Sequence, residues 1–344
     1  MKMVKQLMII ILTVMLVASS SVLAKDSESR YVYPITIMSD NWFDYSVLEK
    51  VEMLRIDDQT LKQMNDKQLI EAIADYPYLV DIYFFDSLKE GLESFAYECS
   101  AYCELIRRPD YERSLEIYGK MLIDYYRVNP RRDGQTEFVI FALQDIMETV
   151  CGTSHEEIQR FSDENQVGSS NSILSVPTTP SGGSVVYSTP SEGHTSSYHS
   201  ASDNNTVATY GVELIRVGSC RYNCHSYAWH STSSSNIYWI PSPQAYMNDS
   251  YYTNFYTGST SATCSSLGLC GNDRIVYSGN AHSAIFAGNP YSNTSIGSAL
   301  VISKWGQAGV FRHTLTNVPA IYGYSTIRIY KPTYAQDGII NQEE

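Results

Sequence analysis

The sequence is poor in positive charge. Its 344 residues hold 24 Lys and Arg against 37 Asp and Glu, which gives a formal net charge of −13 at pH 7. A chain of this charge is repelled by nucleic acids and is not drawn to anionic membranes or to anionic cell-wall polymers. We therefore expect no nucleic-acid partner.

Long apolar runs are also lacking, with one exception at the N-terminus. Lys2 and Lys5 precede an apolar run over residues 7–18, and Val22-Leu23-Ala24 has small side chains where signal peptidase needs them. The run is shorter than the roughly 20 apolar residues of a membrane-spanning helix, and no second run follows. Residues 1–24 are therefore expected to be a removable signal peptide. This predicts a secreted or cell-surface protein without a stable membrane anchor.

The charged residues are unevenly distributed along the chain. Residues 25–165 hold 15 Lys and Arg against 29 Asp and Glu, whereas residues 166–330 hold 6 against 5. This asymmetry predicts two differently built parts. The acidic part lacks the alternating ligands of an EF-hand, so its carboxylates are interpreted as a solvated face and not as a calcium site.

Residues 30–165 are predicted to form an acidic, all-α helical bundle, which is also a candidate docking site for a protein partner. Apolar residues recur there at helical spacing, and prolines follow the periodic segments. Amphipathic helices with short connections pack as bundles. The expected helices begin at Asn65 or Asp66, run over residues 87–107, begin at Asp110, run over residues 136–150, and begin at Ser154 with a capping-box Glu157.

The composition changes after residue 165. Residues 166–206 are rich in Ser, Gly, Thr and Pro and are interpreted as a linker. Residues 207–332 are expected to form a second domain, followed by a polar tail over residues 333–344. Predicted strands, with apolar and polar residues alternating, cover residues 212–217, 273–279, 282–288, 299–306 and 325–332, and residues 238–270 are predicted to be irregular surface.

One of the seven cysteines is a candidate nucleophile. Cys224 lies where a helical pattern begins, inside the stretch RVGSCRYNCHSYAWHS over residues 216–231. Backbone N–H groups at a helix start stabilise a thiolate, which is the nucleophilic form of cysteine. Asn223, directly before it, is a good capping residue and a candidate donor to an oxyanion. The odd number of cysteines also leaves at least one thiol outside intramolecular disulfides.

A nucleophilic cysteine needs an imidazole within hydrogen-bond reach. His282 follows the turn-like stretch SGNA and opens a predicted strand, which would display its ring at a sheet edge. A third group should orient this ring. The following segments offer four candidates for that role, which are Ser303, Lys304, His313 and Asn317.

The combination of Cys224 at a helix start, HSAIFAGN over residues 282–289 and VISKWGQAG over residues 301–309 resembles the papain-like cysteine hydrolases. The nearer likeness is to bacterial cell-wall amidases and endopeptidases of the CHAP type, and it covers roughly residues 211–330. The resemblance implies an α+β domain in which the helix carrying the cysteine packs on an antiparallel sheet. It also implies hydrolysis of an amide bond in a peptide or a peptidoglycan stem peptide. We expect no cofactor and no metal.

The resemblance also implies roles for individual residues. Cys224 would be the nucleophile of an acyl-enzyme, His282 the general base and acid, and Trp305 the ring that shields the group orienting the histidine. Ser303 stands where the family has an asparagine. The glutamine that precedes the family's cysteine is missing, so Asn223 or the backbone N–H of Cys224 would form the oxyanion hole.

Cys224 has two alternative interpretations, and the protein has one rival function. An exported chain uses cysteines for disulfides, and paired cysteines with a nearby histidine can bind zinc. The disulfide partners would be Cys220, Cys264 or Cys270, and the zinc ligands would be these cysteines with His225 or His230. The rival function is that of a non-catalytic binding or adhesion protein with a degenerate papain-like fold.

Overall fold

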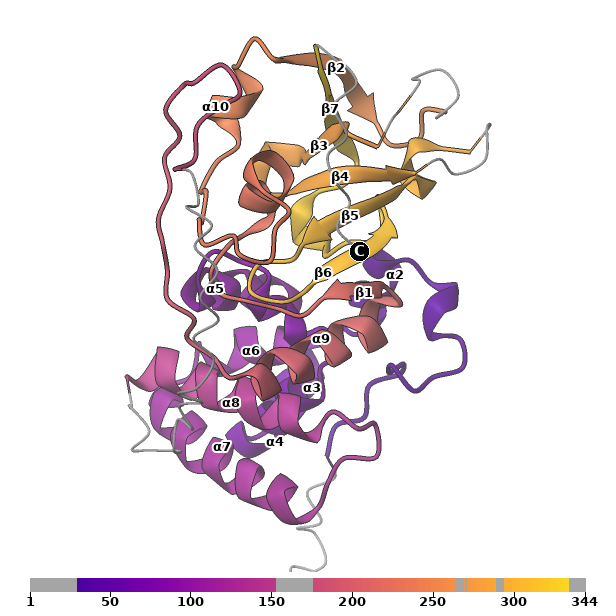
Figure 1. The fold of residues 1–344 in the computed structure, drawn as a ribbon. Coiled ribbons are helices and arrows are strands. Elements are labelled where there is room, and N and C mark those ends of the chain that lie inside the picture. Colours follow the sequence, from indigo (N-terminus) through magenta and orange to yellow (C-terminus); the bar gives the residue numbers. More distant parts are fainter. Residues whose placement is uncertain (1–29, 153–175, 264–268, 270, 289–293, 334–344) are drawn as a thin grey trace, which may run out of the picture.

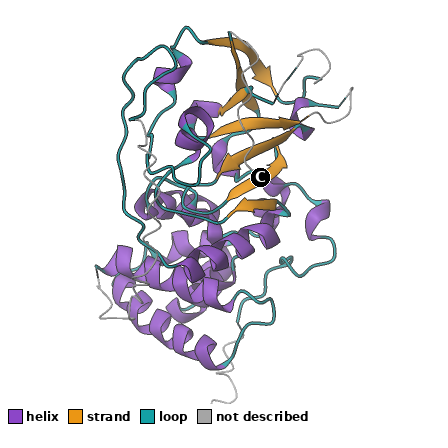
Figure 2. Cartoon of the chain, viewed as in Figure 1, coloured by secondary structure: helices purple, strands orange, loops and turns teal. Residues whose placement is uncertain are grey.

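The structure, a computed structural model, has helices mainly in the N-terminal half and a sheet in the C-terminal half, as predicted (Figures 1 and 2). It describes residues 30–152, 176–263, 269, 271–288 and 294–333. Several predicted features lie outside these residues, namely the signal peptide, the helix at Ser154, the linker up to residue 175, Cys264, Cys270 and the tail beyond residue 333.

The helical half follows from local capping signals. Asn65 starts α4 with a capping box, because its side chain accepts from the backbone N–H of Gln68 and its own N–H donates to the Gln68 side chain. The longest helices, α7 and α8, pack against each other. The helices of this half are α2 (Val47–Met53), α3 (Asp58–Gln63), α4 (Asp66–Asp75), α5 (Leu88–Glu98), α6 (Ser100–Leu105), α7 (Tyr111–Val128) and α8 (Thr136–Cys151), with the short turns η1 (Trp42–Asp44) and η2 (Leu79–Tyr83).

The single helix predicted over residues 87–107 is in fact two helices. The backbone of Cys99 is extended, with φ −91° and ψ 101°, and this residue separates α5 from α6. Ser100 Oγ accepts a hydrogen bond of 3.0 Å from the backbone N–H of Ile56, which ties the break to a neighbouring segment. The apolar periodicity continues across the break, so it could not reveal it.

The C-terminal half forms a seven-stranded antiparallel sheet in the order β1-β6-β5-β4-β3-β7-β2. The five predicted strands are all present. The expectation of irregular structure over residues 238–270 was wrong in part, because this range contains α10 (Gln244–Met247) and β2, an edge strand whose polar, exposed residues hide its pattern. The strands are β1 (Glu213–Arg216), β2 (Tyr252–Ser259), β3 (Arg274–Tyr277), β4 (Ser283–Gly288), β5 (Leu300–Lys304), β6 (Val310–Thr314) and β7 (Thr326–Pro332).

The end of the predicted linker is a helix. Helix α9 (Ser196–Tyr210) begins at Thr195, whose side chain accepts from the N–H of Tyr198, and it lies between α8 and the β1 edge of the sheet (Figure 1). Composition misled here because α9 buries polar side chains instead of an apolar stripe. The buried polar residues are His199, Ser202, Asp203, Asn205, Thr206 and Thr209.

Residues 176–195, here called the strap, run along one side of the molecule from the α10 end to α9 (Figure 1). Ser181 Oγ donates to Asp249 Oδ1 at 2.8 Å, and Ser188 pairs with Trp239 through an isolated antiparallel bridge. The strap is therefore bonded to the sheet half over its length, in contrast to the loose linker that its composition predicted.

The two halves share one hydrophobic core, which contains residues from both. Tyr322 OH donates to the carbonyl of Phe84 at 2.9 Å, and the N–H of Gln307 donates to the carbonyl of Tyr83 at 2.9 Å. The ring of Trp305 contacts Phe84 edge-on, with ring centroids 5.2 Å apart. The segment around η2 in the helical half is thus part of the packing around β5 and β6.

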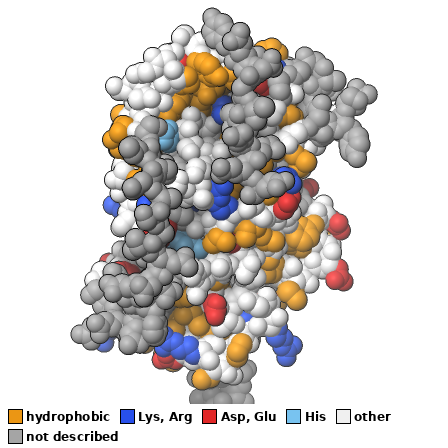
Figure 3. All heavy atoms as spheres, in the orientation of Figure 1, with side chains coloured by type: hydrophobic (Ala, Val, Ile, Leu, Met, Phe, Trp, Pro, Cys, Tyr) orange, Lys and Arg blue, Asp and Glu red, His pale blue; other side chains and the backbone are white. Residues whose placement is uncertain are grey.

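The surface keeps the charge asymmetry of the sequence. On the face shown in Figure 3, charged side chains lie more over the helical half than over the sheet half. Among the described residues, no helix combines the length and the apolar character that a membrane span requires.

Candidate active site

Cys224 is the first helical residue after Asn223, as predicted. Asn223 Oδ1 accepts from the backbone N–H of Ser226 at 3.1 Å, and the chain continues into the π-helical turn η3 (Ser226–His230). π-Helical turns are rare and occur frequently at functional sites. The Cys224 side chain is buried, with 7% of its surface exposed.

The amide of Asn223 has a structural task. Its Nδ2 donates to the carbonyl of Ile240 at 2.8 Å, and its Oδ1 accepts from the N–H of Ile240 at 3.3 Å. The side-chain N–H that was predicted as an oxyanion donor is therefore already bonded to the backbone. The residue fixes the start of the helix and the segment at Ile240.

His282 lies directly before β4, after a tight turn in which Gly279 and Asn280 both have positive φ (66° and 65°). The ring is fully buried and stacks on Tyr322, with centroids 4.0 Å apart and planes 6° from parallel. Tyr277 contacts it edge-on at 5.1 Å. Neither ring nitrogen has a hydrogen-bond partner among the described residues. A buried imidazole without partners is costly, and aromatic packing is what holds this ring.

A hydrogen-bonded chain joins the cysteine helix to the histidine strand. Trp229 Nε1 donates to Ser283 Oγ at 3.0 Å, and Ser283 Oγ bonds His225 Nδ1 at 2.8 Å. His225, which the sequence offered as an alternative zinc ligand, is buried and bonded within this hydrogen-bonded chain. Burial lowers the pKa of His225 to about 4, so the ring is neutral. We call His225, Ser283 and Trp229 the clamp.

The clamp joins the residue after Cys224 to the residue after His282. Cys224 precedes His225, and His282 precedes Ser283. Burial raises the pKa of Cys224 to about 12, and the carboxylate of Asp86 raises it further. Backbone hydrogen bonds to the sulfur from Ser283 and His225 act in the opposite direction. The thiol therefore lies against the first residue of β4.

Burial also lowers the pKa of His282 well below its usual value, and the neighbouring His313 and His225 lower it further. In this structure the thiol of Cys224 and the imidazole of His282 are consequently both neutral. This differs from a resting thiolate–imidazolium pair, because the buried site disfavours each charged form.

Ser303, the predicted third residue, bonds a different histidine. Ser303 Oγ lies 2.7 Å from His313 Nε2, and Trp305 Nε1 donates to the same Oγ at 2.9 Å. His313 Nδ1 bonds the carbonyl of Thr314 at 2.8 Å, which makes Nδ1 the protonated nitrogen and Ser303 the donor to Nε2. The influence of His313 on the pKa of His282 places this buried group near the candidate base.

The other two candidates for the third role are engaged elsewhere. Lys304 Nζ donates to the carbonyls of Ser219, Gly306 and Ala308 at 3.0, 2.6 and 2.6 Å. Asn317 Nδ2 donates to the carbonyl of Tyr210 at 2.7 Å. Of the four, only Ser303 and His313 form a pair at the His282 side of the sheet.

The structure adds residues that sequence reasoning missed. Ser283, Tyr322 and Asp86 contact or influence the candidate pair, and Asp86 comes from the helical half, 138 positions before Cys224. No spacing rule links such distant positions, so only the shared core could bring them together. The serine after His282 was visible in HSAIFAGN, but its bond to His225 depends on the register of η3 against β4.

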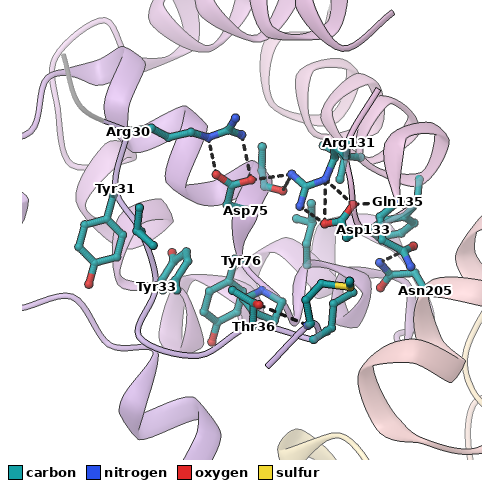
Figure 4. Close-up of a pocket in the computed structure, with 18 residues that line it drawn as sticks. Arg30, Tyr31, Tyr33, Thr36, Asp75, Tyr76, Arg131, Asp133, Gln135 and Asn205 are labelled. Atoms are coloured by element: carbon teal, nitrogen blue, oxygen red, sulfur yellow. Dashed lines mark hydrogen bonds and ion pairs between the residues drawn. The ribbon is translucent and has the colours of Figure 1, made fainter. Parts of the chain in front are cut away.

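A separate pocket lies in the helical half (Figure 4). Arg30 and Arg131 both form ion pairs with Asp75 across its wall, and Arg131 also pairs with Asp133. The charges that line this pocket thus neutralise one another. The pocket is not lined by Cys224 or His282.

The cysteines of the described chain are free thiols, namely Cys99, Cys103, Cys151, Cys220 and Cys224. A disulfide between Cys220 and Cys224 is therefore not formed. The comparisons of this chain with protein-family models, with curated proteins and with solved structures found no match.

Proposed function

We propose that the protein is an exported papain-like thiol hydrolase that cleaves amide bonds in peptides or in peptidoglycan stem peptides, with Cys224 as nucleophile and His282 as general base and acid. The observation that carries the proposal is the clamp. Its bond between His225 and Ser283 holds the residues that follow the cysteine and the histidine against each other at 2.8 Å.

The chemistry proceeds through a thioester. His282 takes the thiol proton of Cys224 as the sulfur bonds the carbonyl carbon of the substrate, and the carbonyl electron pair moves to oxygen. When the C–N bond breaks, His282 returns the proton to the leaving nitrogen. Water then gives a proton to His282 and attacks the thioester, the C–S bond breaks, and the sulfur regains its proton.

The surroundings of the pair suit this proton transfer. The backbone N–H groups of Ser283 and His225 stabilise the sulfur as it becomes negative. The stacked Tyr322 restricts the plane of the His282 ring. Because Asn223 is bonded to Ile240, the backbone N–H of Cys224 is the proposed oxyanion donor. We propose that Ser303 acts as a positioning residue through His313, in place of the family's asparagine.

One observation favours the rival function, a non-catalytic binding or adhesion protein. Cys224 is 7% exposed and His282 is fully buried, so a substrate reaches the pair only after the surrounding segments move. A degenerate site that has lost its substrate cleft would look the same. Hydrolysis separates the two functions, because a binding protein leaves its ligand intact.

The experiment offers the mature protein a library of fluorogenic peptide amides and a digest of purified peptidoglycan, and follows new amino groups by mass spectrometry. We expect hydrolysis by the wild type and by Cys103→Ser, and none by Cys224→Ser. His282→Gln, which keeps a polar side chain of similar size, should lose activity by at least about 100-fold. Hydrolysis that persists in Cys224→Ser, or tight binding without cleavage by the wild type, would refute the proposal.

A further inference from the structure

A second cluster of reactive side chains lies on the other side of the loop that leads to Cys224. Glu192 of the strap, His199 of α9 and Cys220 after β1 place a carboxylate oxygen, a ring nitrogen and a sulfur within 4.8 Å of one another. His199 is buried, with 4% of its surface exposed. The three residues come from three segments, so the cluster depends on the tertiary fold and not on a sequence motif.

Two of the three side chains already bond each other, and the third bonds a neighbouring amide. His199 Nε2 lies 2.8 Å from Glu192 Oε1, and Cys220 Sγ lies 3.4 Å from Gln307 Oε1. The remaining contacts hold the carboxylate in place, since Glu192 accepts from Cys220 N at 2.9 Å and from Ser219 Oγ at 2.7 Å. The carboxylate is therefore fixed beside the imidazole and the thiol, with the three ligand atoms within 4.8 Å of one another.

We propose that Glu192, His199 and Cys220 form a binding site for a divalent metal ion of the zinc type, with Gln307 Oε1 or a solvent molecule in the fourth position. Thiolate and imidazole are ligands of Zn²⁺ and related transition metals, whereas Ca²⁺ and Mg²⁺ take oxygen ligands. One thiolate and one carboxylate also balance the two charges of the ion.

The geometry needs only a small adjustment to accept the ion. Two nitrogen or oxygen ligands of a tetrahedral zinc ion, each about 2.0 Å from it, lie roughly 3.3 Å apart. The present distance of 2.8 Å between His199 and Glu192 would open by a fraction of an ångström. The ion replaces the proton between these two groups, and the thiol proton of Cys220 passes to solvent.

The surroundings allow this arrangement. Gly218 packs closely against His199, because a Cβ at this position would lie 2.9 Å from His199 Nδ1. A larger residue at this position would therefore displace the ring. The positive charge of Lys304, whose Nζ is held by three backbone carbonyls, interacts with Cys220, Asp203 and Glu192. The ligands would thus tie the strap and α9 to the loop four residues before Cys224.

The proposed ligands differ from those that cysteine spacing suggested. The sequence was expected to bind no metal, and its alternative zinc interpretation used Cys220 and Cys224 with Cys264, Cys270 and His225 or His230. In the structure, Cys220 meets a carboxylate and an imidazole from segments that composition assigned to a linker.

The test uses the mature protein, freed of metal by a chelator and titrated with Co²⁺ under reducing conditions. The wild type should take up one ion, develop the charge-transfer absorption of a cobalt–thiolate bond, and lose it when Zn²⁺ is added. Cys220→Ser should lose this absorption and bind Zn²⁺ at least about 100-fold more weakly, and His199→Gln and Glu192→Gln should bind at least about tenfold more weakly.

Cys224→Ser is the matched control, because it removes a thiol four residues away and should leave the absorption unchanged. Thermal unfolding of each metal-free variant shows whether it folds. If Cys220→Ser does not fold, Glu192→Gln, which keeps the shape of the carboxylate, replaces it in the test. Absence of the cobalt–thiolate absorption in the folded wild type overturns the proposal, as does its persistence in Cys220→Ser or its loss in Cys224→Ser. None of these measurements uses hydrolysis, so the metal site and the proposed enzyme can fail separately.

Discussion

At the residue scale, burial decides the protonation of the candidate catalytic pair. The pKa of Cys224 is raised to about 12 and that of His282 is lowered, in both cases mainly by burial. The form able to start the reaction has a neutral thiol and a neutral imidazole. This neutral pair is populated at pH values between the two pKa values. That pH interval is wider than the interval for an exposed cysteine and an exposed histidine.

This protonation predicts an unusual pH profile. We expect kcat/KM of the proposed hydrolase to stay constant as pH falls through 6.5, the ordinary value for histidine, because His282 gains its proton only at lower pH. On the alkaline side, no loss should occur near pH 9, because the Cys224 thiol ionises only at about 12. The measurement is kcat/KM against pH on a cleaved peptide. A midpoint close to 6.5 would show that His282 is solvated in the working enzyme.

The Ser303 hydroxyl gives a stability prediction at the same scale. Ser303→Ala removes the hydroxyl that bonds the ring nitrogens of Trp305 and His313 and leaves only the long contact of 3.4 Å between these two nitrogens. We expect the free energy of unfolding to fall by about 1–3 kcal/mol, the cost of an unsatisfied buried group. Denaturant unfolding measures it, with Ser259→Ala on the exposed edge strand β2 as control. Equal stability of the two variants would mean that solvent replaces the hydroxyl.

At the element scale, the contact between η3 and β4 sets the geometry of the candidate site. Ser283→Ala removes the centre of the clamp, so Trp229 Nε1 and His225 Nδ1 lose their shared partner, and His225 keeps its bond to the backbone of Asn280. We expect kcat to fall by up to about 100-fold, because displacement of a reacting group by about 1 Å costs that much.

The control for this prediction is Ser226→Ala. Ser226 is a buried serine of the same helix that bonds Asn236 and not the clamp. Its loss should destabilise the fold to a similar degree while kcat changes much less. If both variants lose kcat equally, the clamp is structural only.

The turn between β5 and β6 is a second element-scale test. Gly306 has φ +47°, and a Cβ there would lie 2.4 Å from the carbonyl oxygen of Tyr83 in the helical half. Gly306→Ala should therefore lower the melting temperature more than Gly134→Ala, where φ is +75° but nothing lies within 4 Å. Thermal unfolding of both separates the clash from the backbone strain. Equal shifts in melting temperature would show that the backbone moves at this contact and relieves the clash.

Sequence reasoning predicted elements better than their contacts. Periodicity identified five strands of the sheet and most helices, because each has an apolar face that meets the core. It missed the strands β2 and β6 and the helix α9. The polar residues of α9 are buried and those of β2 are exposed, so neither element shows an apolar face in its sequence. Within the site, Cys224 at a helix start was predictable from local spacing. The bond between Ser303 and His313 was not, since it depends on the pairing of β5 with β6.

At the scale of the whole molecule, the helical half and the sheet half behave as one packing unit. The predicted domain boundary at residue 207 falls inside α9, and the helical half contributes Phe84 and Tyr83 to the packing around Trp305 and Gln307. Asp86 of the same half influences the Cys224 thiol. The helical half is thus part of the environment of the candidate site.

This shared core predicts how the sheet half would behave in isolation. A fragment of residues 207–332 would expose the core side of Trp305 and leave Tyr322 OH without the carbonyl of Phe84. Each large aromatic side chain brought into water costs about 1.5–3 kcal/mol, and a domain has only about 5–15 kcal/mol in total. We expect the fragment to show no cooperative thermal transition and no hydrolysis, whereas residues 25–344 unfold in one step. Circular dichroism of both chains tests this. A fragment that melts cooperatively would show that the sheet half folds alone and that the shared core joins two independent domains.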